Sequence, residues 1–373
     1  MRLALAVAAL ISLAACPPTG AQVEQSPQQR LGRAIFFDIS LSEPQGQACA
    51  SCHAPAAGFT SPLSANNSKA AVVPGAAPGR AGNRTPPSVA YAAFAPPLHW
   101  NRRDKTYVGG QFRDGRAADL ADQAKVPFLN PLEMNNPDGA TVCAKVARAS
   151  YAGGFAVAFD RPLDCATDGF DTIVRALAAY EMSREVNPFS SKYDAWLAGK
   201  TALTAQERHG LELYRGQAKC DQCHPSKPGP GKRPPLFTDF TYDNVGAPKN
   251  PDNPFYHQAA AFNPAGTAYI DEGLGGFLKK PDQFGKFKVP TLRNIAAGGE
   301  GFVRAYLHNG SLMGLKEVMA FYNRRDIEPD RWRPEEPRNV NRDELGNLRL
   351  SDKDEDDVIA FLRTLTDGWS PSD

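Results

Sequence analysis

Apolar residues recur at helical spacing in several stretches of the chain. Between residues 170 and 185, apolar positions fall on one face of a helix, and residues 314–322 show the same period. Residues 352–365 begin with an acidic run that suits the positive end of a helix dipole. Alternating patterns typical of strands are scarce. The pattern therefore predicts a mainly α-helical protein.

A break in this pattern divides the chain. Residues 187–191 end one helical stretch, and Thr204 with Glu207 has the sequence of a capping box that starts the next helix. We expect one domain over residues 22–187 and a second over 188–373. The 32 glycines and 32 prolines indicate long ordered loops between the helices.

The N-terminus resembles an export signal. Arg2 precedes an apolar run over residues 3–13 that is too short to span a bilayer, so residues 1–21 are interpreted as a signal peptide. Residues 13–16 resemble a lipoprotein signal, in which Cys16 would be acylated and would tether the protein to a membrane. Ordinary cleavage near Ala21 is the alternative. Both interpretations predict a periplasmic protein.

The motif C-x-x-C-H occurs twice. Its two copies are Cys49, Cys52 and His53, and Cys220, Cys223 and His224. This spacing is the signature of covalent c-type haem, in which both thiols bind the porphyrin and the histidine ligates the iron. A zinc site or a redox dithiol would also use C-x-x-C, but a histidine after the second cysteine in both copies argues against them. We expect two haems c, which would add apolar volume to a chain that is 42% hydrophobic.

Two cysteines remain in the mature chain, Cys143 and Cys165. In an oxidising compartment we expect a disulfide between them. Two free buried thiols are the alternative. The net charge of +1 gives no sign of a nucleic-acid partner.

Seven short pieces of the chain match the pattern of one known family, in the family's order. They are residues 31–38, 114–117, 130–134, 178–181, 187–189, 288–295 and 308–310. Together they resemble the bacterial di-haem cytochrome c peroxidase and MauG family, over nearly the whole mature chain. The resemblance implies two cytochrome-c-like domains with haems near their interface. The first haem would react with peroxide, and the second would store and pass electrons.

The resemblance assigns Glu133 to the distal side of the first haem, with Gln123 and Pro127 as neighbours. Glu133 would take the peroxide proton and return it to the leaving oxygen, a role that burial would favour by raising its pKa. A solvated loop carboxylate is the alternative. Family peroxidases commonly close this haem with a loop histidine. None lies between His53 and His99, so we expect an open iron unless His99 binds it.

The distal ligand of the second haem separates the branches of the family. Family peroxidases place a methionine fourteen residues after the histidine of piece 308–310, and MauG has a tyrosine there. In this chain the position is Tyr322. A phenolate favours the higher oxidation states of iron. Met319, one turn earlier, is the rival ligand and Met313 a more distant one, although both methionines could simply fill the core.

One departure from the family pattern is the residue between the haems. Arg113 stands where the family usually has a tryptophan between the haems, so Trp100, Tyr107 or Phe112 would have to substitute, or Arg113 would contact a haem propionate. The family also holds a calcium ion between its domains.

For that calcium ion we expect the side chain of Asn83 and the carbonyls of Val303 and Ala305, because oxygen ligands suit calcium. The proline that the family usually has at the position of Ala305 is missing.

The resemblance favours the MauG-like branch, which includes MauG and the methanobactin-associated MbnH. Hydrogen peroxide would produce a high-valent iron state shared by both haems, which would oxidise a Trp or Tyr residue of a periplasmic partner protein. One alternative is a cytochrome c peroxidase fed by a small cytochrome, which Met319 as a ligand would favour. The other is a non-enzymatic di-haem electron carrier, which His99 as a ligand would favour.

Overall fold

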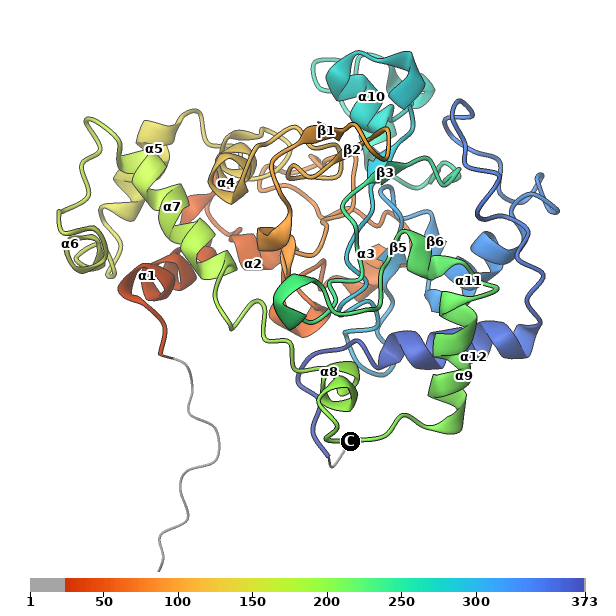
Figure 1. The fold of residues 1–373 in the computed structure, drawn as a ribbon. Coiled ribbons are helices and arrows are strands. Elements are labelled where there is room, and N and C mark those ends of the chain that lie inside the picture. Colours follow the sequence, from red (N-terminus) through yellow and green to blue (C-terminus); the bar gives the residue numbers. More distant parts are fainter. Residues whose placement is uncertain (1–23, 372–373) are drawn as a thin grey trace, which may run out of the picture.

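The computed structural model describes residues 24–371, and helices account for most of its regular structure (Figure 1). The prediction of a mainly α-helical protein is confirmed. The α-helices are α1 (Pro27–Phe36), α2 (Cys49–Cys52), α3 (Ser64–Asn67), α4 (Leu120–Leu129), α5 (Gly139–Val146), α6 (Gly154–Phe159), α7 (Gly169–Glu181), α8 (Lys192–Leu197), α9 (Ala205–Arg215), α10 (Gly273–Leu278), α11 (Leu315–Arg324) and α12 (Asp352–Arg363). Short 3-10 helices are η1 (Ile39–Leu41), η2 (Pro55–Ala57), η3 (Ala92–Phe94), η4 (Cys220–Gln222), η5 (Pro230–Lys232), η6 (Pro254–His257), η7 (Gly266–Ala268) and η8 (Pro281–Gln283).

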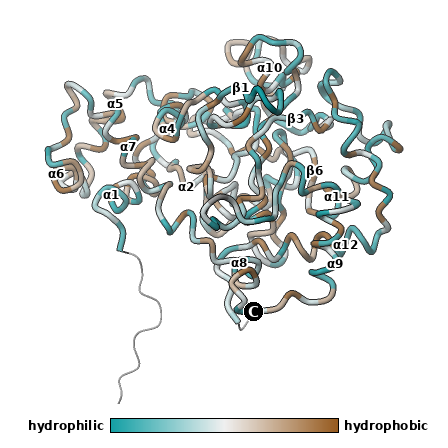
Figure 2. The backbone as a smooth tube through the Cα atoms, in the orientation of Figure 1, coloured by the Kyte–Doolittle hydropathy of each residue, from teal (hydrophilic) through white to brown (hydrophobic). Residues whose placement is uncertain are grey.

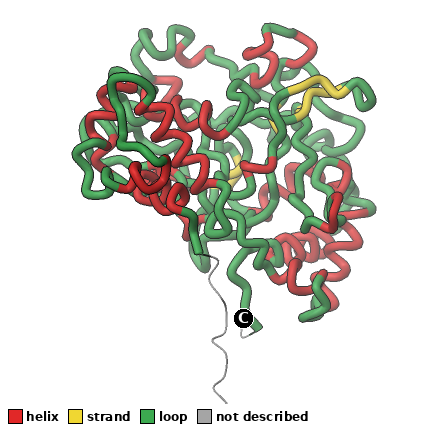
Figure 3. Tube along the Cα trace, turned by 60° about the vertical axis from the view of Figure 1, so that its left-hand side comes forward, coloured by secondary structure: helices red, strands yellow, loops and turns green. Residues whose placement is uncertain are grey.

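Strands form three small antiparallel ladders, each of two strands, in the described part of the chain. They pair β1 (His99–Asn101) with β2 (Thr106–Val108), β3 (Tyr242–Asp243) with β4 (Phe287–Lys288), and β5 (Ala305–Tyr306) with β6 (Leu312–Met313). Long loops connect these elements, as Figure 3 shows. The long loops predicted from the glycine and proline content are therefore present.

Capping boxes fix the start of several helices. At α9, the backbone N–H of Glu207 donates to Thr204 Oγ1 at 3.1 Å, and Thr204 N–H donates to Glu207 Oε2 at 2.7 Å. Ser26, Ser191 and Ser351 cap α1, α8 and α12 in the same way. The capping box predicted at Thr204 is confirmed.

Two pairs of helices cross at glycines. A Cβ added at Gly32 of α1 would lie 1.9 Å from the carbonyl oxygen of Ala176 in α7, and one added at Gly210 of α9 would lie 1.9 Å from that of Asp357 in α12. Only a residue without a side chain lets the helix backbones approach this closely. Each half of the molecule therefore has one close helix crossing at a glycine.

Each crossing belongs to its own apolar core. The first core gathers residues of α1, α4, α5 and α7, including Phe36, Val142 and Leu177. The second gathers residues of α8, α9 and α12, including Tyr214 and Phe361. The helices of the two cores lie at opposite sides of the molecule in Figure 1, and Figure 2 shows apolar segments in both groups.

A disulfide fastens the first core. Cys143 of α5 bonds to Cys165 in the loop before α7, as the sequence predicts. None of the helices within residues 24–371 is long and apolar enough to cross a membrane. The predicted signal peptide, with Cys16, falls outside the described residues.

The loop between α2 and β1 ties the two halves together. Thr85 N–H donates to the carbonyl of His308 at 2.8 Å, and the hydroxyl of Tyr91 donates to Asp367 Oδ2 at 2.7 Å. Arg84 of the same loop pairs with Asp271 at 2.7 Å. This segment therefore contacts the C-terminal half.

Candidate functional site

The first C-x-x-C-H motif lines a cavity of about 1440 Å³, a volume that includes the cavity's opening to solvent. Helix α2 carries its two cysteines, and α4 with the loop after it closes the opposite wall. The cavity brings together all six residues predicted for the first haem: Cys49, Cys52, His53, Gln123, Pro127 and Glu133. Residues far apart in the chain thus share one chamber.

His53 is held in the form that a metal requires. Its Nδ1 lies 3.2 Å from the carbonyl oxygen of Phe59, and burial lowers its pKa. A carbonyl that accepts from Nδ1 fixes the neutral tautomer and leaves Nε2 free as a ligand. The geometry therefore fits iron ligation by His53.

Glu133 is set up as a proton acceptor and donor. Burial raises its pKa, while a hydrogen bond from Asn130 and the charge of Arg116 oppose the rise. Gln123 and Pro127 lie one turn apart on α4 and line the same wall. A carboxyl with a raised pKa inside a cavity is suited to general acid–base chemistry.

The second C-x-x-C-H motif lines a cavity of about 1340 Å³. It borders Cys220, Cys223, His224, Met319 and Tyr322. His224 Nδ1 lies 2.8 Å from the carbonyl oxygen of Phe237, and burial lowers the pKa of this histidine to about 4. The arrangement repeats that of His53 in the other half.

Both candidate distal ligands of the second cavity lie on α11. No hydrogen bond joins the Tyr322 hydroxyl to any residue that the structure describes, and burial raises the pKa of this phenol. Met319 is 4% exposed and belongs to the second apolar core. Met313 lies on β6 and is not among the residues that border the cavity.

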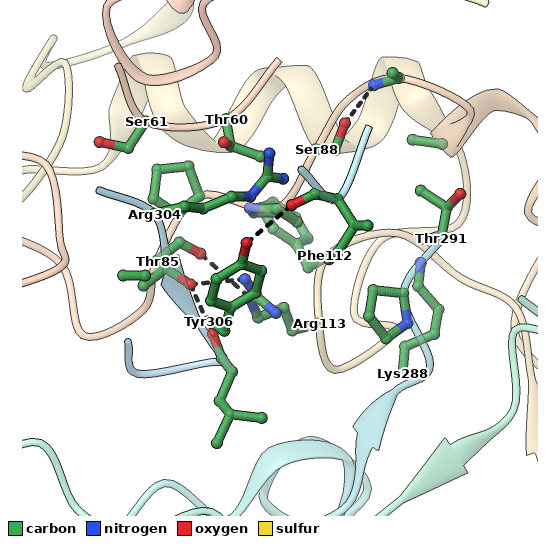
Figure 4. A pocket seen from close by; sticks show the side chains of 18 of the residues that line it. Thr60, Ser61, Thr85, Ser88, Phe112, Arg113, Lys288, Thr291, Arg304 and Tyr306 are labelled. Atoms are coloured by element: carbon green, nitrogen blue, oxygen red, sulfur yellow. Dashed lines mark hydrogen bonds between the residues drawn. The ribbon is translucent and has the colours of Figure 1, made fainter. Parts of the chain in front are cut away.

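A third cavity, of about 1040 Å³, is drawn in Figure 4 and shares lining residues with each of the other two. Arg113 borders all three cavities. Phe112 borders the third and the first, and Tyr306 borders the third and the second. Arg113 therefore occupies the junction at which the family usually has a tryptophan.

Three cations in this region have no carboxylate partner within residues 24–371. Arg113 donates to the carbonyl and hydroxyl oxygens of Thr85 at 3.1 and 2.7 Å, Lys288 donates to the carbonyl of Gly110, and Arg304 donates to that of Asn294 at 2.7 Å. Burial lowers the pKa of all three groups, that of Arg113 to about 9 and that of Lys288 to about 8.

Buried charges require compensation, and the carboxylates of haem propionates would be suitable partners for these three cations. The donor set therefore fits two haems. The cationic role of Arg113 agrees with its predicted contact with a propionate.

The other predicted aromatic and histidine candidates lie elsewhere. His99, Trp100 and Tyr107 are on the β1–β2 hairpin, where His99 and Trp100 are exposed. None of the three is among the residues that border the first cavity. Of the aromatic residues proposed to replace the family tryptophan, the structure brings only Phe112 to the junction.

The structure does not bring together the three predicted calcium ligands. The Asn83 amide donates to the Tyr269 hydroxyl at 2.9 Å and to Asp271 at 3.1 Å. The asparagine that meets the Val303 carbonyl, at 3.0 Å, is Asn67. Asn67 and Val303 are 236 positions apart in the chain, so their contact depends on the tertiary structure and not on local sequence.

Sequence reasoning also missed Glu181. This residue belongs to piece 178–181, is 4% exposed and borders the first cavity. Its Oε2 has no hydrogen-bond partner in the described chain, and burial raises its pKa to about 8. Its position at the end of the apolar face of α7 is the feature of the sequence that indicates a buried carboxyl.

Comparison with known proteins gives consistent relatives. The family model for di-haem cytochrome c peroxidase matches residues 26–202. Methylamine utilization protein MauG of Paracoccus denitrificans is 37% identical, covering 97% of this chain and 96% of that protein. Cytochrome c551 peroxidase of Pseudomonas aeruginosa is 28% identical, covering 91% and 79%.

Solved structures agree with these relatives. The diheme peroxidase BthA from Burkholderia thailandensis has a TM-score of 0.80 at 34% identity, covering 95% of this chain and 89% of that one. A MauG-like protein associated with microbial copper homeostasis has a TM-score of 0.67 at 27% identity, covering 97% of each chain.

Proposed function

The chain belongs to the di-haem cytochrome c peroxidase and MauG family, and from this premise we propose that it is a MauG-like oxidase. Membership makes it a haem-dependent oxidoreductase that uses peroxide. The proposed substrate is a Trp or Tyr residue of a partner protein in the periplasm. The predicted signal peptide supports that location, and acylation of Cys16 would add a membrane tether.

Two haems c would be held by the two C-x-x-C-H motifs and would supply the iron that exchanges electrons with peroxide. Glu133 then moves the proton. Its carboxylate would accept a proton from one oxygen of the peroxide and, as the acid, return it to the other oxygen as that oxygen departs. Gln123 and Pro127 shape the wall beside it, and Arg113, Lys288 and Arg304 balance the propionates.

The observation that carries the proposal is the Tyr322 hydroxyl, which borders the second cavity without a hydrogen bond to another described residue. Coordination to the iron of the second haem would give this oxygen a partner inside the cavity. A hard anionic oxygen favours oxidised iron, which suits an oxidase more than an electron-accepting peroxidase.

The second candidate function is a cytochrome c peroxidase that takes electrons from a small cytochrome. Met319 favours it, since this side chain borders the same cavity and a thioether ligand raises the reduction potential of haem. The relatives include proteins of both kinds.

Ferric EPR spectroscopy of the purified holoprotein distinguishes these functions. An oxidase with an open first haem and Tyr322 on the second gives one high-spin and one low-spin signal. Added peroxide should then produce a near-infrared charge-resonance band. A sulfur-to-iron charge-transfer band in the optical spectrum, which a methionine ligand on the second haem would give, would favour the peroxidase. Two low-spin signals and no reaction with peroxide would leave an electron carrier.

A further inference from the structure

The β1–β2 hairpin lies beside α10 at the upper edge of Figure 1, and Lys280 after α10 contacts Tyr107 of the hairpin. Trp100 is 44% exposed and meets Tyr107 edge to face, with ring centroids 4.9 Å apart. Lys280, just after α10, donates to the Tyr107 hydroxyl at 2.6 Å, and Phe277 of α10 is 44% exposed. Exposed aromatic side chains such as those of Trp100 and Phe277 are typical of protein interfaces.

Basic residues surround this aromatic group. The hairpin turn exposes Arg102, Arg103 and Lys105 against one acid, Asp104, while Lys279 and Lys280 are exposed at the end of α10 with one acid, Asp282, beside them. Hydrogen bonds from the backbone of Arg103 and Asp104 to Asn101 Oδ1, at 3.0 and 3.3 Å, hold the turn. For a chain with a net charge of only +1, this is a local concentration of positive charge that selects acidic partners.

The same hairpin leads directly to the cavities. Strand β2 continues into residues 109–113, so Phe112 follows Tyr107 by five positions and Arg113 by six. Both Phe112 and Arg113 border the third cavity. Gly109 N–H donates to the Phe240 carbonyl at 3.0 Å, which fixes this strand to the C-terminal half. The aromatic group therefore lies at the surface end of the segment that joins the cavities.

We propose that the β1–β2 hairpin, residues 99–108, together with residues 277–280 is the docking surface for an acidic protein substrate. Trp100 and Phe277 supply the apolar contact, and Arg102, Arg103 and Lys105 attract the partner's carboxylates. This inference rests on the proposed function, because it names the surface on which the oxidised partner binds.

Two synthetic peptides test the surface with the full-length holoenzyme. Each carries one tryptophan, flanked by glutamates in one peptide and by lysines in the other. Mass spectrometry follows peroxide-dependent oxidation of that tryptophan. We expect the acidic peptide to be oxidised with the higher kcat/KM, and its advantage to shrink from about 20 to about 200 mM salt, because salt screens exposed charges.

Charge reversal locates the effect. R102E/R103E/K105E should lower kcat/KM for the acidic peptide about tenfold and raise it for the lysine peptide, since electrostatic steering acts on association. The matched control R184E/K200E/R208E changes the net charge equally at exposed residues near α7, α8 and α9. This control variant should change kcat/KM for each of the two peptides by less than about twofold.

Trp100 tests the apolar contact. Trp100→Ser should raise KM for the acidic peptide and leave kcat unchanged, while Trp100→Phe should retain the lower KM, because an aromatic anchor survives. Oxidation of guaiacol, a small neutral phenol, reports the basal reaction and should be unchanged in every variant.

Equal effects of the two triple reversals would overturn the docking surface, as would equal oxidation of both peptides by an enzyme that oxidises guaiacol. Failure of the unmodified holoenzyme to oxidise guaiacol and both peptides would instead overturn the proposed function, and this inference with it.

Discussion

Buried polar side chains set the chemistry at the scale of single residues. Glu133 and Glu181 border the first cavity with raised pKa values, because burial disfavours their charged forms. Arg113 and Lys288 border the third cavity with lowered pKa values for the same reason. The cavities therefore combine carboxyls that hold protons readily with cations that require an anionic group.

The first prediction concerns Glu133. Glu133→Gln should lower kcat/KM for peroxide about 100-fold, because an amide cannot carry the proton. In the unmodified enzyme the rate should rise with pH through the raised pKa of Glu133, since the carboxylate is the base. Stopped-flow rates across pH should show that rise, and the variant should lose it.

Glu43→Gln is the matched control, because Glu43 has a side chain that is 54% exposed and lies outside the cavity lining. A variant at Glu133 with an unchanged rate and pH profile would remove this residue from the reaction.

The second prediction concerns Tyr322. Tyr322→Met should raise the reduction potential of the second haem by on the order of 100 mV, since a thioether stabilises ferrous iron relative to a phenolate. Spectroelectrochemical titration measures the change. Met319→Leu should leave the potential near its original value; a large shift in that variant, with none in Tyr322→Met, would identify Met319 as the ligand.

At the scale of elements, each half is organised by a helix crossing next to a C-x-x-C-H motif. Helices α1 and α7 cross at Gly32, and α9 and α12 cross at Gly210. The periodicity of the sequence predicts the helices, and the capping residues predict where α9 begins. The sequence pattern does not predict where the helices cross, because a close approach of two helices depends on the surface of the partner helix.

The third prediction tests these crossings. Gly32→Ala and Gly210→Ala should each lower the free energy of unfolding by about 1–3 kcal/mol, because the added methyl forces packed helices apart. Gly153→Ala is the control: nothing lies within 4 Å of its added Cβ, and φ is −59°. Chemical denaturation should show no loss there, and equal losses at all three positions would contradict the packing argument.

At the scale of the whole molecule, the segment between α2 and β1 connects the two halves. Asn67 and Thr85 of the first half contact backbone carbonyls of Val303 and His308 in the second. Rotation of the Asn67 amide by 180° would present Oδ1 beside the Val303 carbonyl, which is the type of ligand set that calcium prefers.

The fourth prediction follows from that junction. Calcium at about 100 times its dissociation constant should stabilise the protein by about 2.7 kcal/mol, and a chelator should remove the gain. Asn67→Ala should abolish the dependence in thermal unfolding. Asn83→Ala should retain it, since Asn83 bonds to Tyr269 and Asp271; the reverse result would restore Asn83 as the ligand.

The sequence by itself determined the features that depend on local order. The helical class, the capping box at Thr204, both C-x-x-C-H motifs and the family follow from residues close together in the chain, because short-range spacing fixes helix faces and haem attachment. The sequence also favoured the disulfide between Cys143 and Cys165, since the four cysteines of the C-x-x-C-H motifs are assigned to haem, and the structure confirms it.

Only the tertiary structure decided which distant residues share a space. It placed Arg113 at the junction of three cavities, gave Asn67 in place of Asn83 to Val303, and left His99 on the surface. It also showed Glu181 as a buried carboxyl whose Oε2 has no hydrogen-bond partner within residues 24–371. The physical reason is that burial and electrostatic environment arise from long-range packing, which residue spacing along the chain does not encode.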